Sequence, residues 1–304
     1  MSHPGLQYGP CPEALDTCHH EEFSRNGFLA FESVLSESEV THVRQALQDL
    51  MVGLYDDLKK DRAEVYAPPP GKPDNYKGLH IHKKDSGFWV QFEPSVEDPA
   101  SLSPLEAILH CRKLAGFVPE HPALQALSAH PRVQGLVEEI LGADAIMFGN
   151  LALSKPPKIG SEKPWHQDDA YFSYLPLDAI VTAWVALDDS TVDNGCMFTI
   201  PGAHLGGAKR HIHGTDCQID DGRLDLSQSV PVELKAGGAM FFSGMLPHQT
   251  PPNRSSRTRQ AVQFQYRSVH SRKVSHQEYE TVFSETDGTP ATCRSAALET
   301  KDRY

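Results

Sequence analysis

The feature that most constrains the fold is a polar motif in the middle of the chain, Trp165-His166-Gln167-Asp168-Asp169-Ala170-Tyr171-Phe172. On a strand, residues i and i+2 point to the same side, so we expect His166 and Asp168 to face one point, with Gln167 turned away. Two ligands hold a metal weakly. The third candidate is His248, which follows the apolar run 239–242 far along the chain. The fold must therefore bring two distant segments together.

Two histidines and one aspartate form the 2-His-1-carboxylate ligand set that leaves positions open on an octahedral iron(II) ion. His-x-Asp alone is a weak signal in a chain with 16 histidines. Arg257 and Arg259 strengthen it, because they follow His248 at the start of an alternating run, 260–266, that is typical of a strand. On one strand the two arginines would share a face, so alternation does not choose between them.

These residues resemble a known family. His166, Asp168, His248 and Arg259, together with 193–195 and 200–204, are similar to motifs of the phytanoyl-CoA dioxygenase (PhyH-like) branch of iron(II)/2-oxoglutarate oxygenases. The resemblance extends from about Glu22 to about Tyr266. It implies a mainly β fold with flanking helices: a double-stranded β-helix (jelly-roll, cupin-like) barrel with N-terminal helices packed on the major sheet.

The resemblance also implies a function. His166, Asp168 and His248 would hold iron(II), 2-oxoglutarate and O2 would be co-substrates, and ascorbate would stimulate turnover. The enzyme would hydroxylate, or otherwise oxidise, a small-molecule substrate while 2-oxoglutarate loses CO2 to become succinate. The family pattern favours Arg259 over Arg257 as the anchor of the far carboxylate, and an arginine suits that position because its planar fork donates two parallel hydrogen bonds.

Three further residues match positions that the family places beside 2-oxoglutarate: Lys113, Leu151 and Trp184. Each has a simpler interpretation, since Lys113 could be a solvated helix lysine and Trp184 ordinary core. A second class of function also stays open: a cupin-like metal-binding protein or a Lewis-acid isomerase that does not use 2-oxoglutarate. A charge-transfer band on anaerobic addition of 2-oxoglutarate to the iron(II) protein distinguishes the two classes.

The rest of the chain predicts one main domain. We expect a loose N-terminal arm at 1–18, a single oxygenase domain at 19–269 and a polar extension at 270–304 without catalytic residues. A capping box at Ser36 and Glu39 predicts a helix through Leu50, and the pattern between 102 and 142 is also helical. Short strands are predicted at 26–31, 145–154, 164–172, 180–188, 196–200, 230–235, 239–243 and 259–267.

Other polar residues compete with the main site or border it. His80 and His82 share a strand face, either as a rival metal site or at the mouth of the substrate pocket. The polar segment 206–228, which contains His211 and His213, is long enough to be a functional loop over the site. Gln263 is expected either to contact the substrate or to make a structural hydrogen bond.

Composition excludes several partners. The formal net charge of −12 argues against nucleic acid, whose binding needs clustered Lys and Arg, and no apolar run is long enough to cross a membrane. The six cysteines include no Cys-x-x-Cys pair, and six in 304 residues do not indicate a disulfide scaffold. Cys11 and Cys18 are interpreted as ordinary thiols, and a reducing cytoplasm is the expected location.

Overall fold

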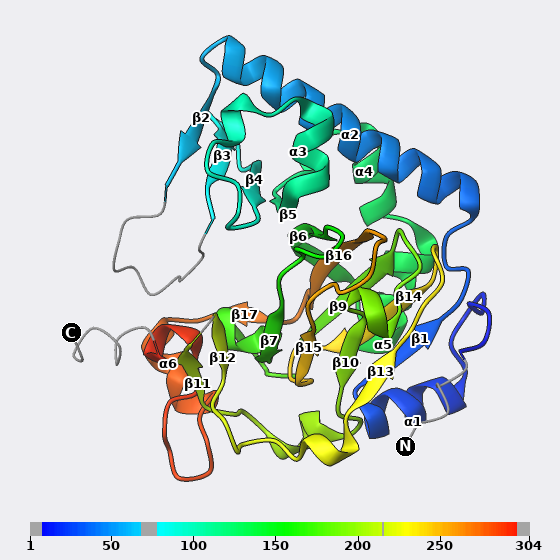
Figure 1. Ribbon diagram of the computed structural model, residues 1–304. Coiled ribbons are helices and arrows are strands. Elements are labelled where there is room, and N and C mark those ends of the chain that lie inside the picture. The colour runs from blue at the N-terminus through cyan, green and yellow to red at the C-terminus, as the bar shows by residue number, and fades with distance from the viewer. Residues whose placement is uncertain (1–7, 68–77, 215, 297–304) are drawn as a thin grey trace.

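A computed structural model describes residues 8–67, 78–214 and 216–296 of the chain. Two antiparallel sheets face one another, and helices cover the outer side of the larger one (Figure 1). The helices are α1 (Thr17–Asn26), α2 (Glu37–Lys59), α3 (Pro104–His110), α4 (Pro122–Ser128), α5 (Leu136–Leu141) and α6 (His276–Val282). Among the described residues, none of the helices combines the length and the apolar character needed to cross a membrane.

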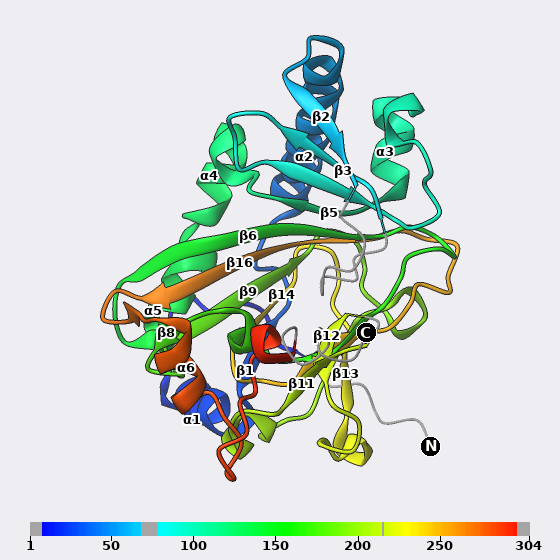
Figure 2. The ribbon, with the colours of Figure 1, turned by 90° about the vertical axis from the view of Figure 1, so that its left-hand side faces the viewer.

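The large sheet has nine strands in the order β1-β14-β9-β16-β6-β5-β4-β3-β2. Their bounds are β1 (Phe28–Phe31), β2 (Ala63–Tyr66), β3 (His80–Lys83), β4 (Trp89–Phe92), β5 (Cys111–Ala115), β6 (Ala145–Lys155), β9 (Ile180–Ala186), β14 (Ala239–Ser243) and β16 (Arg259–Ser268). Figure 2 shows β6 and β16 crossing the molecule, with α2 and α4 above them and β13 below.

The facing sheet has four strands in the order β13-β10-β15-β7. They are β7 (Lys163–His166), β10 (Met197–Thr199), β13 (Val230–Val232) and β15 (His248–Thr250). Two small two-stranded sheets complete the fold, formed by β11 (His211–His213) with β12 (Cys217–Ile219) and by β8 (Tyr174–Leu175) with β17 (Arg272–Lys273).

Alternation along the strands separates the two faces of the large sheet. In β9, Val181, Ala183 and Val185 belong to the apolar cluster beneath α2, α4 and α5, whereas Trp184 and Ala186 belong to the cluster between the sheets. A strand buried on both faces reads as a continuous apolar run, as 180–187 does. The predicted mainly β fold with flanking helices is confirmed, and the two facing sheets formed by the described strands are both open.

Several local expectations differ from the structure. The segment between 102 and 142 contains helices, but strand β5 interrupts them at 111–115. Helix α1 begins at Thr17, inside the segment expected to be irregular, because Asp16 and His19 form a capping box that the sequence reading overlooked. The helix predicted from Ser36 and Glu39 is confirmed as α2, with the expected capping box.

Candidate active site

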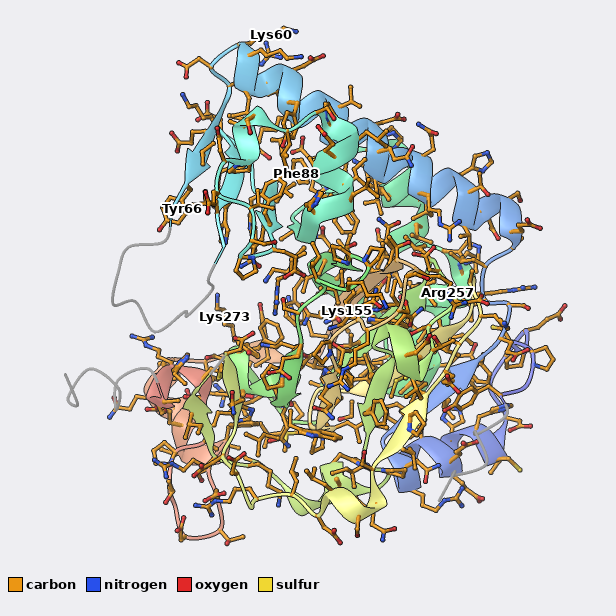
Figure 3. All side chains as sticks on the ribbon, viewed as in Figure 1. Lys60, Tyr66, Phe88, Lys155, Arg257 and Lys273 are labelled. Carbon is orange, nitrogen blue, oxygen red and sulfur yellow. A yellow bond between two sulfur atoms is a disulfide. The ribbon has the colours of Figure 1, made fainter. Side chains whose placement is uncertain are left out.

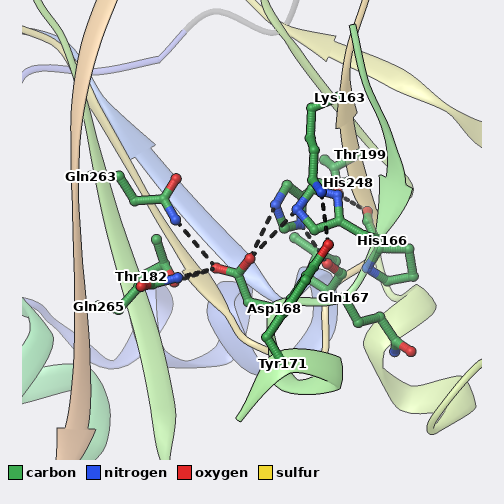
Figure 4. A network of polar contacts seen from close by, with 12 residues as sticks. Lys163, His166, Gln167, Asp168, Tyr171, Thr182, Thr199, His248, Gln263 and Gln265 are labelled. Atoms are coloured by element: carbon green, nitrogen blue, oxygen red, sulfur yellow. Dashed lines mark hydrogen bonds and ion pairs between the residues drawn. The ribbon is translucent and has the colours of Figure 1, made fainter. Parts of the chain in front are cut away.

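The three expected metal ligands meet between the two sheets. His166 ends β7, His248 begins β15 in register with it, and Asp168 begins a 3-10 turn, Asp168–Tyr171. Oδ1 of Asp168 lies 3.6 Å from Nε2 of His166 and 3.8 Å from Nε2 of His248. All three side chains are buried, and their ligand atoms lie within 4.8 Å of one another (Figure 4). Among the described residues this is the one His/Cys/Asp/Glu group with that geometry.

Backbone carbonyls orient both imidazoles. Nδ1 of His166 lies 2.8 Å from the carbonyl oxygen of Pro164, and Nδ1 of His248 lies 2.9 Å from that of Leu246. A carbonyl only accepts, so each Nδ1 donates its proton and each Nε2 keeps a lone pair facing Asp168. Metal-binding histidines show this arrangement, in which the second nitrogen fixes the ring.

The Asp168 carboxylate is held by its other oxygen. Oδ2 accepts hydrogen bonds from Oγ1 of Thr182 at 2.8 Å, Nε2 of Gln265 at 3.3 Å and Nε2 of Gln263 at 3.5 Å (Figure 4). Oδ1 is thereby directed at the two imidazoles. Gln263 makes the structural hydrogen bond that was one of its two expected roles, and it also lines the cavity.

The electrostatics of the cluster favour the ligand forms of these groups. Burial raises the pKa of the Asp168 carboxyl, but the hydrogen bond with His166, the charges of the two histidines and the Thr182 hydroxyl outweigh it, so its pKa lies below the ordinary value. Burial, together with nearby His166, lowers the pKa of His248 to about 3. A carboxylate and a neutral imidazole are the forms that bind a metal ion.

The chain around Asp168 is not the strand that we predicted for 164–172. The strand ends at His166, and the turn that follows is fixed by a hydrogen bond from N of Asp169 to O of Gly244 at 3.0 Å. Gln167 points away from the cluster, as expected. Its side chain donates to the carbonyls of Gly207 and Met245 and accepts from N of Lys209.

A cavity of about 310 Å³ opens beside the triad. Its lining contains all seven residues that the family resemblance assigned to iron or 2-oxoglutarate, which are His166, Asp168, His248, Arg259, Trp184, Lys113 and Leu151. They come from both sheets, so the cavity lies between them.

Arg259 suits a carboxylate ligand. Its side chain is buried, and its Nε and Nη1 atoms have no hydrogen-bond partner among the described residues. Burial lowers the pKa of Arg259 to about 10, which leaves the guanidinium charged at neutral pH. Its charged group lies 5.5 Å from the ring centre of Trp184, whose Nε1 is also buried without a partner. Orphaned donors are costly in an interior, so these atoms indicate a bound acceptor.

The two arginines do not share a face, contrary to our expectation, because β16 begins only at Arg259. Arg257 lies in the preceding loop, where its exposed side chain comes within 3.5 Å of Asp193 (Figure 3).

Lys113 and Leu151 reach the cavity from neighbouring strands. Lys113 lies on β5 and not on a helix, in register with Leu153 of β6, and its Nζ lies 4.9 Å from the ring centre of Trp89. Leu151 pairs with Gln263 of β16 on the same face.

Sequence reasoning missed Lys155, which lines the cavity opposite Arg259 in the register of β6 and β16 (Figure 3). Its side chain is buried, and Nζ donates to the carbonyls of Ser161 and Thr250. Burial, and then the charges of Arg259 and Arg112, hold the pKa of Lys155 well below its ordinary value. Only the pairing of β6 with β16 would have identified this residue, and the sequence does not show that pairing.

The other histidines lie outside the triad. His211 accepts a hydrogen bond from N of Gln167 at 3.2 Å, and His213 lies 3.0 Å from the carbonyl of Cys293. The segment 206–228 thus touches the metal-binding motif through β11. Cys217 and Cys293 form a disulfide that the sequence did not predict, whereas Cys11 and Cys18 are free.

Comparisons with known proteins agree with this geometry. The phytanoyl-CoA dioxygenase (PhyH) family model matches residues 23–261. A rat protein, phytanoyl-CoA dioxygenase domain-containing protein 1, is 24% identical over 257 residues, which cover 80% of this chain and 87% of the rat protein.

Two solved structures share the fold. One is the non-heme alpha ketoglutarate dependent carbocyclase SnoK from nogalamycin biosynthesis, with a TM-score of 0.59, 24% identity, and coverage of 87% of this chain and 89% of SnoK. The other is EvdO2 from Micromonospora carbonacea var. aurantiaca complexed with 2-oxoglutarate, with a TM-score of 0.53, 25% identity, and coverage of 86% and 94%. Because the family model spans most of the sequence, this chain belongs to the phytanoyl-CoA dioxygenase (PhyH) family.

Proposed function

We propose that the protein is an iron(II)/2-oxoglutarate-dependent oxygenase that hydroxylates, or otherwise oxidises, a small molecule while 2-oxoglutarate is converted to succinate and CO2. The observation that carries this proposal is the buried His166, Asp168 and His248 cluster beside the unpartnered guanidinium of Arg259. Family membership and the 2-oxoglutarate in the related EvdO2 structure support it.

The donor set fits iron(II). Two neutral imidazoles and one carboxylate give nitrogen and oxygen ligands on one side of an ion and leave the opposite positions open. When bound, iron(II) supplies the site for oxygen activation. The protein contributes ligand orientation, through the carbonyls of Pro164 and Leu246 and through Thr182, so that little reorganisation accompanies binding.

We assign Arg259 to the far carboxylate of 2-oxoglutarate. Its buried Nε and Nη1 donors have no partner among the described residues, a planar guanidinium can hold a carboxylate through two hydrogen bonds, and Trp184 packs beside it. Lys155 lies next to Arg259 across β6 and β16, while Lys113 and Leu151 line the same cavity. Apolar and aromatic side chains also line it, and charge-assisted contacts are stronger where less water is present.

The test is turnover by purified protein with iron(II), 2-oxoglutarate, ascorbate and O2, measured as succinate over a panel of candidate substrates. We expect His166→Ala and Asp168→Ala to abolish succinate formation, and exposed His42→Ala to retain it. Anaerobic addition of 2-oxoglutarate to the iron(II) protein should produce a visible charge-transfer band. Unchanged turnover in the triad variants, or no band in the wild type, would contradict the proposal.

The substrate is proposed to be a small molecule that reaches the cavity between the sheets. A concave, mostly apolar pocket with a few convergent polar groups is typical of such ligands. The net charge of −12 disfavours a nucleic-acid substrate.

We also propose that the protein works in the cytoplasm. Four of its cysteines are free, and both sulfurs of the disulfide belong to buried residues, Cys217 and Cys293. Thiol–disulfide exchange requires access to sulfur, so burial protects this bond in a reducing compartment. Cell fractionation tests the proposal, and recovery of the protein from secreted or organelle fractions would contradict it.

A further inference from the structure

The face of the large sheet that forms the cavity continues beyond it. Register places Tyr66 of β2 opposite His80 of β3, His80 opposite Gln91 of β4, and Gln91 opposite Lys113 of β5. Because side chains opposite one another lie on one face, these residues extend the face that carries Lys113. Figures 1 and 2 show β2 and β3 at the end of the sheet that lies away from β13.

Flat rings cover this extension. His80 and His82 stack on Trp89, with centroid distances of 5.0 and 5.9 Å and interplanar angles of 13° and 10°. The ring centre of Tyr66 lies 5.2 Å from that of His82, and 37% of the surface of Tyr66 is exposed. We call Tyr66, His80, His82 and Trp89 the aromatic ledge.

The ledge differs from the packed core behind it. On the opposite face of the same strands, Ile81 and Val90 are fully buried beneath the helices, in the cluster that contains α2. None of the four ledge residues belongs to an apolar cluster, and His80, His82 and Trp89 are only half-buried. Their exposed ring surface is available to a ligand.

Polar atoms without partners lie along the same face. Both amide atoms of Gln91 are buried and unpartnered, as is Nε2 of His80, among the residues that the structure describes. Such groups cost free energy unless a ligand or water binds them. Burial, with the charges of His82 and Lys113, lowers the pKa of His80 to about 4, so its ring is neutral at neutral pH and stacks without carrying a charge.

Lys113 joins the ledge to the cavity. Its side chain lines the cavity, and Nζ lies 4.9 Å from the ring centre of Trp89. A molecule that reaches the triad from the ledge therefore passes flat rings and then the cation of Lys113.

We propose that the aromatic ledge binds a planar, conjugated ring of the substrate, while the part to be oxidised lies at the triad. This inference deepens the proposed function and rests on it. Parallel aromatic faces favour a flat π-system over a saturated chain, because stacked ring pairs gain energy beyond the area that they bury. The unpartnered atoms of Gln91 and His80 suit polar substituents at the ring edge.

The test compares two carboxylates with the same carbon skeleton, 2-naphthoate with flat aromatic rings and its saturated, puckered decahydro analogue. Each is titrated anaerobically by calorimetry into the iron(II) protein with saturating 2-oxoglutarate, and the charge-transfer band shows whether 2-oxoglutarate stays bound. We expect the wild type to bind 2-naphthoate about tenfold more tightly, the preference that stacking on the ledge supplies.

Substitutions test whether the preference for 2-naphthoate comes from the aromatic ledge. Trp89→Ala should bring the two affinities to within about twofold, Trp89→Phe should keep most of the preference, and His42→Ala, on the far helix, should keep all of it. The measured quantity is a ratio within one variant, so partial unfolding of Trp89→Ala lowers both affinities together and leaves the ratio unchanged.

Two results would overturn the proposal that the ledge binds a planar ring: no preference for 2-naphthoate in the wild type, or an undiminished preference in Trp89→Ala. A missing charge-transfer band together with a ring preference that depends on Trp89 would contradict the proposed function and leave the ledge in place. A normal charge-transfer band without a ring preference would support the proposed function and contradict the ledge proposal.

Discussion

Two regions adjoin the site, one in contact with the metal-binding motif and one connected to the cavity through Lys113, and they are built in different ways. We call residues 207–214, 216–219 and 276–293 the C-terminal clamp. Its polar groups bind the motif strand and each other: N of Gln167 donates to His211, Nδ1 of His211 lies 2.9 Å from the carbonyl of Ala291, and the Tyr279 hydroxyl donates to O of Asp169. The aromatic ledge has half-buried or exposed rings, and none of its residues belongs to an apolar cluster.

The two regions therefore differ in role: the clamp holds the metal-binding motif, and the ledge recognises the substrate. The clamp adds a third apolar cluster, which includes Ala170 of the motif and Tyr279 and Phe283 of the C-terminal segment. A region with many buried apolar contacts opens rarely, whereas a region with few such contacts adapts to a ligand. The clamp therefore keeps Asp168 in place, and the ledge is the side on which substrates are distinguished.

The largest effect is expected between the two regions, at Arg259. Replacing it by Met should raise the KM for 2-oxoglutarate by ~100-fold or more, since removing one partner of a buried ion pair costs about 3–5 kcal/mol. Succinate formation at varied 2-oxoglutarate concentration measures this change.

The matched control is Arg257→Met, two residues earlier and exposed beside Asp193. It should change the KM by less than about twofold, as surface ion pairs contribute little. Equal effects of the two substitutions would show that Arg259 is not the anchor, and a dominant effect of Arg257→Met would exchange their roles.

The stability of the clamp should depend on its disulfide bond. Cys217 and Cys293 are separated by 76 positions, and closing a loop of that length stabilises the fold by ~4 kcal/mol in the chain-entropy model. We expect Cys293→Ser to lower the urea midpoint accordingly, while the charge-transfer band persists because Arg259 and Trp184 lie on the large sheet.

Cys18→Ser, at an exposed free thiol, serves as the reference for this measurement. If Cys293→Ser unfolded at the same urea concentration as Cys18→Ser, the bond would contribute nothing and the clamp would be held by its hydrogen bonds alone.

The sequence predicted the triad for a reason that the structure revises. Strand alternation was expected to bring His166 and Asp168 to one side, but the strand ends at His166. The two side chains converge because a 3-10 turn, held by O of Gly244, replaces the next strand step. Gly244 lies four residues before His248, so the segment that carries His248 determines the conformation of the segment that carries Asp168. No local pattern around 166–168 contains that information.

Long-range pairing explains the other gaps. The positions of Lys155 and Gln91 relative to the site follow from the pairing of β6 with β16 and of β4 with β5. The Cys217–Cys293 bond joins segments whose spacing has no motif. By contrast, α2 and the shared face of His80 and His82 depend on neighbouring residues alone, and the sequence predicted both.

Acid should weaken the clamp more than the ledge. Burial, with the charge of His166, lowers the pKa of His211 from 6.5 to about 3. As the pH falls below 6.5 the unfolded chain binds a proton at this residue and the folded chain does not, so stability decreases by about 1.4 kcal/mol per pH unit until about pH 3. Above pH 6.5 this contribution is constant.

Urea unfolding of the metal-free protein between pH 7.5 and 4.5 measures this slope. His211→Gln, which can still accept from Gln167, should flatten it by about that amount. His80→Gln should flatten it less, because His80 is half exposed and its pKa falls only to about 4. The reverse order would mean that the ledge is the more tightly buried region.

The smallest effect is expected at the outer end of the ledge. Tyr66 lies on β2, beyond β3 as seen from the cavity, so a two-ring ligand anchored near Lys113 reaches it poorly and a three-ring ligand reaches it better. Tyr66→Ala should therefore weaken 2-naphthoate binding by less than about twofold and 2-anthroate binding by about threefold, within the range of a single exposed aromatic pair. The same calorimetric titrations measure both. A loss that does not grow with ring number would mean that Tyr66 acts through the stability of β2, and the ledge would then end at His80 and His82 of β3.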